Sequence, residues 1–343
     1  MQMVTSHNRL QPKTITPPSL QDIWIAKKRI ASFIKTTPLV QSERLSSVSD
    51  TVAHLKLENL QETGSFKLRG AANKILSLSE EERKKGVTTF STGNHGLAVA
   101  YVARQLGVKA HICISNRVPI NKVKKLSEMG AEVRQAGQNQ DDAEAFSYHL
   151  RDREGMTVIK PFDDPEVIAG QGTIALELLE ELPNLDTCVI PLSGGGLLSG
   201  IALGLKATNP SIQVIGVSMK RAAVMYESIR ANRPVIIPEE TTLADSLLGG
   251  IGTDNRYTFT MVKNYVDDIV LLSEEEIARG MSFLFRHHQI GVEGAAGTAV
   301  SVLLHKKSRK IGLRTAAVVS GSNVDVDRIL EIISAHKGDE DGC

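Results

Sequence analysis

The sequence has no excess of charge of either sign and no long apolar run. Its 343 residues carry 40 Lys and Arg against 39 Asp and Glu, which gives a net charge of +1. A chain so close to neutrality gives no electrostatic reason to expect nucleic acid or an anionic membrane surface as a partner. No apolar run approaches the ~20 residues that a helix needs to span a bilayer. We therefore expect no nucleic acid and no membrane among the partners of this chain.

Cysteine is also scarce, and the N-terminus has little apolar character. Cys113, Cys188 and Cys343 are odd in number and far apart, which argues against a disulfide framework or a zinc motif. Cys113 and Cys188 lie in apolar strand-like runs, where a core cysteine is the ordinary interpretation. Residues 1–18 are polar and contain prolines, without the apolar core of a signal peptide, and we expect a loose arm there. Together these features predict a protein of the reducing cytoplasm.

What the sequence does have is the composition of a globular enzyme and a regular alternation of elements. It is 41% hydrophobic and 23% charged. Strand-like apolar runs at 87–90, 108–114, 131–135 and 157–159 alternate with helical stretches at 96–106, 121–129 and 141–153. A second series of strand-like runs follows at 187–192, 214–217, 269–272 and 315–319, interrupted by an irregular segment at 232–257. Such alternation is typical of parallel sheets covered by helices on both faces.

The two series predict two domains. Residues 51–57 resemble one further strand that belongs with the second series. Residues 86–160 would then form a small domain inserted into a large domain made of residues 1–85 and 161–343. The predicted fold class is α/β, with two open, mostly parallel, twisted sheets covered by helices. Ligands in such folds bind beyond the carboxyl ends of the strands, so the loops there are the candidate sites.

One of these loops, Ser193-Gly-Gly-Gly-Leu197, is suited to a phosphate group. Successive glycines before a helix let backbone N–H groups approach an anion, and the helix N-terminus adds partial positive charge. A tight strand-to-helix turn is the plainer alternative. A dinucleotide fingerprint fails because Ser199 stands where the third glycine is required, and no Gly-Lys-Ser/Thr motif of a nucleoside-triphosphate loop occurs. The phosphate would therefore belong to another kind of ligand.

Two further loops carry reactive or polar side chains. Lys67 follows an aromatic residue at the start of a helical stretch, in Gly64-Ser-Phe-Lys-Leu-Arg-Gly70. A partly desolvated lysine can become a nucleophilic amine, although a solvated surface lysine is the commoner case. The other loop, Ser91-Thr-Gly-Asn-His-Gly96, could wrap a carboxylate with backbone N–H groups or could simply cap a helix.

Together and in this order, the three loops strongly resemble those of the fold-type II pyridoxal 5′-phosphate (PLP) enzymes. The resemblance covers residues 20–333, and the most similar group is that of serine/threonine dehydratases and serine racemase. It implies a fold like that of the tryptophan synthase β chain. It also implies that PLP is the cofactor and that a small amino acid is the substrate.

The resemblance assigns cofactor-binding roles to particular residues. Lys67 would hold PLP as a Schiff base and move the α-proton, and Phe66 would pack against the cofactor ring. Asn94 would bind the phenolic oxygen, Ser320 would meet the pyridine nitrogen, and Glu293 would lie near the ring. The phosphate would be bound by the backbone N–H groups of Gly194, Gly195, Gly196 and Leu197.

The substrate carboxylate would be bound by the other polar loop. The resemblance places Ser91, Thr92, Asn94 and His95 around it. A serine hydroxyl at the pyridine nitrogen leaves that nitrogen neutral, which makes the ring a weaker electron sink. A long-lived carbanion is then less favoured, and loss of a β-leaving group competes well. The products would be a 2-oxo acid and ammonia.

Departures from the family pattern refine the expectation. Thr92 stands where serine racemases have a serine that acts on the opposite face of the substrate, so Thr92 is the second candidate catalytic residue. Residues 218–221 read Ser-Met-Lys-Arg in place of a segment with a metal-binding glutamate, so we expect no metal. Ser246 replaces a glycine, and this version looks most like the dehydratase of hydroxyectoine utilisation. The regulatory domain of biosynthetic threonine dehydratases is missing after residue 333, so we expect no feedback inhibition through it.

The sequence therefore predicts a PLP-dependent lyase that eliminates the β-hydroxyl group of a small hydroxy amino acid, placed in hydroxyectoine utilisation. A general L-threonine/L-serine ammonia-lyase or a serine racemase is the first alternative. A non-catalytic PLP-binding protein is the second, and the presence of Lys67 argues against it. A cytoplasmic homodimer is the expected form.

Overall fold

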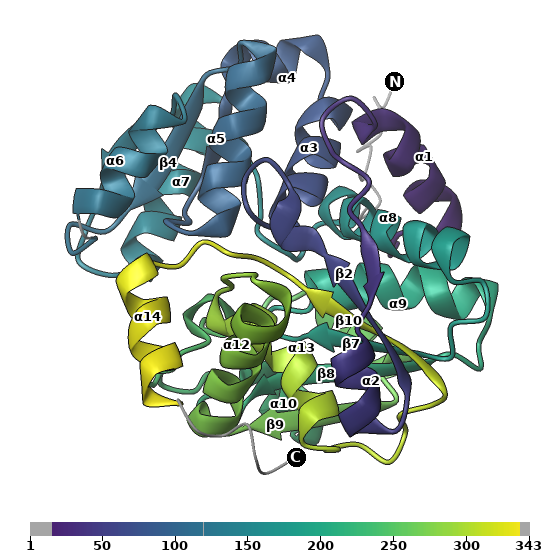
Figure 1. The fold of residues 1–343 in the computed structure, drawn as a ribbon. Coiled ribbons are helices and arrows are strands. Elements are labelled where there is room, and N and C mark those ends of the chain that lie inside the picture. Colours follow the sequence, from purple (N-terminus) through teal and green to yellow (C-terminus); the bar gives the residue numbers. More distant parts are fainter. Residues whose placement is uncertain (1–15, 119, 337–343) are drawn as a thin grey trace, which may run out of the picture.

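The structure is a computed structural model, and it describes residues 16–118 and 120–336. Within these ranges the chain forms two sheets with helices packed around them (Figure 1). Most of the predicted N-terminal arm, and Cys343, lie outside the described residues. No helix in the described part of the chain is long and apolar enough to cross a membrane.

The larger sheet has six strands in the order β1-β2-β10-β7-β8-β9. Their bounds are Leu39–Gln41 (β1), Val52–Leu57 (β2), Thr187–Pro191 (β7), Gln213–Met219 (β8), Asp268–Leu272 (β9) and Arg314–Val319 (β10). The strands run parallel except for the edge strand β1, which is antiparallel to β2. The parallel pairing of β2 with β10 confirms that residues 51–57 add a strand to the second series. The sequence pattern gives no sign of the short edge strand β1.

The smaller sheet has four parallel strands in the order β5-β4-β3-β6. Their bounds are Val87–Thr89 (β3), Ala110–Ile114 (β4), Glu132–Gln135 (β5) and Thr157–Val158 (β6). The helices between them are α5 (Asn94–Leu106), α6 (Ile120–Glu128) and α7 (Gln140–Glu154). The predicted elements and the predicted fold class are confirmed. The domain boundaries stay a prediction, because α3 (Lys67–Ser77) packs into the same apolar cluster as α5 from outside the 86–160 segment.

Helices cover both faces of the larger sheet, so alternate residues of its strands enter two different apolar clusters. Val189 of β7 packs in one cluster, and its neighbours Cys188 and Ile190 pack in the other. One face carries α2 (Glu43–Ser49), α12 (Glu274–His288) and α13 (Gly294–Leu304), and the other carries α8 (Pro165–Glu181), α9 (Gly196–Thr208), α10 (Val224–Arg230) and α11 (Thr258–Tyr265). The remaining helices are α1 (Leu20–Ile30), α4 (Glu80–Lys85), α14 (Val326–Ala335) and the short 3₁₀ helices η1 (Glu58–Leu60) and η2 (Asp245–Leu247). Cys113 and Cys188 are buried and free, as expected of core cysteines.

A buried group of four charged side chains fixes the start of α3. Arg69 lies 2.7 Å from Glu58 and 2.6 Å from Glu177, and Lys56 lies 2.8 Å from Glu177. Burial alone would raise the pKa of Glu58, but the charge of Arg69 lowers it overall. Two positive and two negative charges balance, which makes their burial tolerable. Because Arg69 is two residues from Lys67, this group holds the lysine-bearing turn in place.

Candidate active site

Parallel pairing brings three of the predicted loops together at the carboxyl ends of the strands of the larger sheet. In the register of β2 and β10, Leu57 lies opposite Val319, so these strands end side by side. Strand β10 also pairs with β7, whose carboxyl end leads into the glycine loop. The lysine loop, the Ser320 loop and the glycine loop therefore follow three adjacent strands.

The lysine loop and the Ser320 loop are joined through their backbones. The N–H of Phe66 donates to the carbonyl of Ser320 at 3.1 Å, and the N–H of Ser322 donates to the carbonyl of Gly64 at 2.9 Å. Ser65 and Gly321 form an isolated antiparallel bridge between them. Ser320 is buried, and its hydroxyl has no hydrogen-bond partner among residues 16–118 and 120–336. Lys67 and Ser320 are thereby held in the same small region.

The amine of Lys67 is placed for reactivity. It is the first residue of α3, and its Nζ donates a 2.8 Å hydrogen bond to the carbonyl of Pro161. The same nitrogen lies 5.3 Å from the ring centre of Phe66. Burial lowers the pKa of Lys67 to about 8, while the charge of Glu293 opposes this shift. A lowered pKa increases the neutral, nucleophilic fraction of the amine near pH 7.

Glu293 forms the centre of a polar network that joins both sheets. It is the N-cap residue of α13 and is buried, and Asn94 Nδ2 lies 2.9 Å from each of its carboxylate oxygens. Ser246 Oγ donates to Glu293 Oε1 at 2.9 Å, and Asn323 Nδ2 donates to Asn94 Oδ1 at 2.6 Å. Burial raises the pKa of Glu293, and the hydrogen bonds from Asn94 and Ser246 oppose the shift.

The glycine loop leads into α9 as the sequence predicts. Gly195 is the N-cap residue of α9 and has a backbone φ of +88°, which residues that carry a side chain rarely adopt. A Cβ on Gly194 would lie 2.4 Å from Phe162, and one on Gly196 would lie 2.9 Å from the same residue. The first N–H groups of α9 have no acceptor within the helix. They point outward from its positive end, where an anion is stabilised.

The loop at 91–96 opens helix α5 on the smaller sheet. Gly96 allows close packing, because a Cβ there would lie 2.0 Å from the carbonyl of Ser91. Thr92 is partly exposed, and its hydroxyl has no partner among the described residues. Asn94 of this loop donates a hydrogen bond to Glu293, which precedes α13 on the larger sheet. The loop is therefore next to the lysine-bearing region, with the Thr92 hydroxyl free to meet a ligand.

His95 is a neutral, buried ring in this structure. Burial, helped by the charge of Lys67, lowers its pKa to about 3. Its Nε2 lies 2.9 Å from the carbonyl of Ile159, which can only accept, so Nε2 carries the ring proton. Nδ1 is buried and has no partner among the described residues. The predicted contact with a substrate carboxylate stays a prediction, and it requires the ring to turn or to gain a second proton.

The residues that depart from the family pattern differ from one another in burial and in their contacts. Ser218 is buried, Lys220 is exposed, and Arg221 donates to the carbonyl of Thr241 at 2.9 Å. The described residues include no group of three or more His, Cys, Asp or Glu side chains arranged to hold a metal ion. Arg256 is exposed. Of the polar residues that distinguish this chain, Ser246 is the one seen to reach the active-site carboxylate.

Sequence reasoning missed several residues that shape the site. Asn323 connects Asn94 to the lysine loop, since its Nδ2 also donates to the carbonyl of Thr63 at 2.7 Å. Asn323 stands three residues after Ser320 in the same motif, and this is the signal in the sequence that points to it. Asp163 accepts backbone N–H bonds from Tyr257 at 2.9 Å and from two adjacent residues, which pins the irregular loop to the start of α8. Nothing in the sequence near Asp163 indicates this role.

These features define a class of site. A lysine amine with a lowered pKa, an anion-binding helix start and the polar network of Glu293 suit a phosphate-bearing aldehyde cofactor that the lysine can hold covalently. PLP is such a cofactor, and the residues present fit it. The unpartnered hydroxyl of Ser320 and the outward N–H groups of α9 are the groups that it would engage.

The comparisons identify the family. The chain matches the family described as "Pyridoxal-phosphate dependent enzyme" over residues 30–321, and it belongs to that family. It is 41% identical to an L-threonine ammonia-lyase of Thermotoga maritima, over 92% of this chain and 78% of that one. It is 40% identical to a catabolic L-threonine dehydratase of Staphylococcus aureus, over 96% of both chains. The structure is similar to maize serine racemase, with a TM-score of 0.87, 32% identity and coverage of 94% and 98%. The chain is therefore a PLP-dependent enzyme of the dehydratase and ammonia-lyase type.

Proposed function

We propose that this enzyme eliminates the β-hydroxyl group of a small polar hydroxy amino acid and releases ammonia and a 2-oxo acid. We place the reaction in hydroxyectoine utilisation. The observation that carries the proposal is the hydrogen bond from Ser246 to the buried carboxylate of Glu293. It puts an additional hydroxyl group at the active site, where the common dehydratase pattern has no side chain.

The proposed cofactor contacts use groups whose positions the structure defines. PLP, when bound, supplies an electron sink for charge that develops at the α-carbon. Lys67 Nζ would hold the cofactor, and the same amine, free again once the amino group of the substrate has replaced it, would take the α-proton of the substrate; its lowered pKa supports this role. Ser320 Oγ meets the pyridine nitrogen and, being a neutral hydroxyl, adds no charge there. The N–H groups of Gly194 to Leu197 bind the phosphate, and Phe66 packs beside the ring.

The proposed substrate contacts come from the loop that opens α5. Ser91, Thr92 and Asn94 surround the carboxylate, and His95 joins them once its ring turns or gains a second proton, with the N–H groups at the start of the helix as further donors. Thr92 carries a hydroxyl that is free to hold or move a proton on the second face of the substrate. Asn94 is held by Glu293 and Asn323, so its amide is oriented before any ligand enters.

The substrate is proposed from the polar groups around Glu293. Ser246 offers a hydroxyl that a substrate with polar groups beyond those of serine could bind, such as a hydroxylated diaminobutyrate or a 3-hydroxyaspartate. Lys220, Arg221 and Arg256 are solvent-facing side chains, so they add no direct support. The proposal of a polar substrate therefore rests on Ser246 and the carboxylate that it touches.

A competition assay tests this proposal. Purified enzyme is given L-threonine together with a polar β-hydroxy amino acid of the kind named, and the release of each 2-oxo acid is measured. We expect the larger kcat/KM for the polar substrate. A preference for L-threonine or L-serine of tenfold or more, about 1.4 kcal/mol in transition-state binding, contradicts it.

The second candidate function is a general L-threonine/L-serine ammonia-lyase, with or without racemase activity. The names of the relatives favour it, since those from Thermotoga maritima and Staphylococcus aureus are a threonine ammonia-lyase and a threonine dehydratase. The same competition assay separates the two functions. Chiral analysis of residual substrate reports any racemisation.

We also propose that the enzyme is a homodimer of the reducing cytoplasm. Val326 and Leu330 lie one turn apart on α14 and are 67% and 51% exposed, which suits a surface covered by a second copy. Cys113 and Cys188 are free and buried, so no disulfide constrains the fold in the described part of the chain. Sedimentation equilibrium tests the dimer, and a concentration-independent monomer mass contradicts it.

A further inference from the structure

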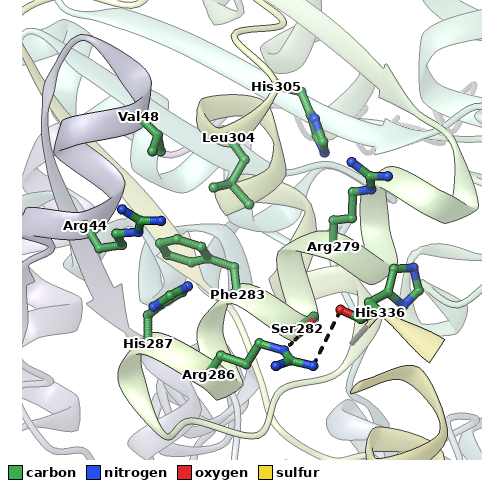
Figure 2. Close-up of a pocket in the computed structure, with 10 residues that line it drawn as sticks. All are labelled: Arg44, Val48, Arg279, Ser282, Phe283, Arg286, His287, Leu304, His305 and His336. Atoms are coloured by element: carbon green, nitrogen blue, oxygen red, sulfur yellow. Dashed lines mark hydrogen bonds between the residues drawn. The ribbon is translucent and has the colours of Figure 1, made fainter. Parts of the chain in front are cut away.

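A pocket with basic side chains around it lies far from the lysine-bearing site, at the opposite end of α13. Helix α13 begins next to Glu293 and ends at Leu304, which lines this pocket. Eleven helical residues span roughly 16 Å. The pocket has a volume of about 80 Å³ and is formed by α2, α12, the end of α13 and the residue after α14 (Figure 2). None of its lining residues belongs to the loops described above.

The titratable side chains around this pocket are all basic. They are Arg44, Arg279, Arg286, His287, His305 and His336. Its apolar wall is formed by Val48, Phe283 and Leu304, and Figure 2 shows Phe283 between the arginine of α2 and the basic groups of α12. A pocket with basic rims and an apolar wall matches a small oxyanion that carries a short apolar part.

Several of the basic groups have structural partners that hold them around the pocket. Arg286 donates to Ser282 Oγ at 3.1 Å and to the carbonyl of Ile333 at 3.0 Å, which ties α12 to the end of α14. Glu275 lies 3.1 Å from Arg279 and 3.3 Å from His336. These contacts fix the walls and account for part of the basic charge.

Two groups are left without such partners. The guanidinium of Arg44 makes no hydrogen bond or ion pair with another residue in the described ranges, although it points toward the pocket in Figure 2. His305 Nε2 is buried and likewise has no hydrogen-bond partner among those residues. A buried ring nitrogen without a partner is unfavourable unless a ligand or water supplies one.

The floor of the pocket is rigid, because α12 and α13 are in direct contact beneath it. A Cβ on Gly280 would lie 2.2 Å from the carbonyl of Gly297 and 2.4 Å from Ser301 Oγ. A pocket on such a floor keeps its shape when it is empty, so a ligand loses little free energy in ordering it.

We propose that this pocket is a binding site for a small oxyanion, a phosphate or a short-chain carboxylate, held by Arg44 and His305 with its apolar part against Phe283 and Leu304. The site does not depend on the substrate or the reaction proposed above. The volume suits an ion of this size and is too small to enclose a nucleotide.

Calorimetric titration of the holoenzyme tests the site. Inorganic phosphate and propionate are the two probes, each at constant ionic strength, and bound PLP keeps the anion site of α9 filled. We expect saturable binding of at least one probe, and the probe that binds more tightly identifies the preferred oxyanion. Arg44→Gln should weaken binding at least tenfold, about 1.4 kcal/mol. His305→Phe, which removes the ring nitrogen, should weaken it by a similar factor.

Matched variants separate a specific site from general charge effects. Arg233→Gln removes the same charge from an exposed position after α10 and should leave the affinity unchanged. Unaltered PLP absorbance shows that each variant is folded. The proposal is overturned by the absence of saturable binding, or by equal weakening in Arg44→Gln and Arg233→Gln.

Discussion

Ser246 Oγ donates a 2.9 Å hydrogen bond to Oε1 of Glu293, the buried carboxylate near Lys67. Ser246 comes from the short 3₁₀ helix η2 in the irregular loop, and Glu293 is the residue that precedes α13. Together with Asn94 Nδ2 on the same carboxylate, this hydroxyl opposes the rise in the pKa of Glu293 that burial produces. The loop thus contributes directly to the electrostatics of the site.

Replacing Ser246 by glycine tests the importance of this contact. We expect Ser246→Gly to lower kcat/KM for a polar β-hydroxy amino acid about tenfold, since one hydrogen bond to a charged group is lost. Turnover of L-threonine should change less. Steady-state kinetics with both substrates measures the ratio, and parallel losses would show that Ser246 supports the loop rather than the substrate.

Thr92 is expected to serve the second face of the substrate. Its hydroxyl is partly exposed at the start of α5 and has no partner among the described residues. Thr92→Ala should suppress racemisation or turnover of a D-isomer while elimination from the L-isomer is largely kept. Chiral chromatography and ammonia release report the two activities. Equal losses in both mean that Thr92 only positions the substrate.

Divalent cations are not expected to activate this enzyme. Ser218, Lys220 and Arg221 occupy the segment where a related metal site has its glutamate, and hard cations require oxygen anions. Activity after exhaustive chelation should equal activity with added magnesium. A several-fold gain in activity on adding magnesium back would show that the enzyme has a metal site and would contradict this prediction.

The lowered pKa of Lys67 has a consequence for stability without cofactor. Burial moves the pKa from 10.5 to about 8, so the folded chain binds fewer protons than the unfolded chain between these values. Stability of the apoenzyme therefore rises with pH across this interval, and below pH ~8 the buried charge opposes folding. Lys67→Met should stabilise the apoenzyme by up to about 3 kcal/mol near pH 7, with a difference that shrinks toward pH ~10.5. Urea denaturation of both proteins measures it, and a constant difference across this range contradicts the assignment.

The sequence predicts those parts of the fold and site that depend on local patterns. Strand and helix periodicity locate nearly all the parallel strands, and glycines before a helix locate the loop at Gly195, because each signal lies within a few residues. The edge strand β1 has only three residues and no alternation, so it leaves no pattern.

Contacts between segments that are distant in the sequence leave no local pattern from which they could be predicted. Asp163 meets the backbone at Tyr257, 94 residues away, through hydrogen bonds that any residue could donate. The basic pocket draws Arg44 and His305 from opposite ends of the chain, and their proximity follows only from the packing of α2 against the α12–α13 face. The family resemblance indicates the role of Lys67, while the lowered pKa of its amine depends on burial that only the fold provides.

The central claim is that Lys67 holds PLP, and reductive trapping tests it most directly. The purified enzyme is reduced with borohydride and digested, and the peptides are analysed by mass spectrometry. We predict a pyridoxyl adduct on Lys67 and its loss, together with loss of activity, in Lys67→Ala. An adduct on another lysine, or a purified wild-type protein that binds no PLP, contradicts the account.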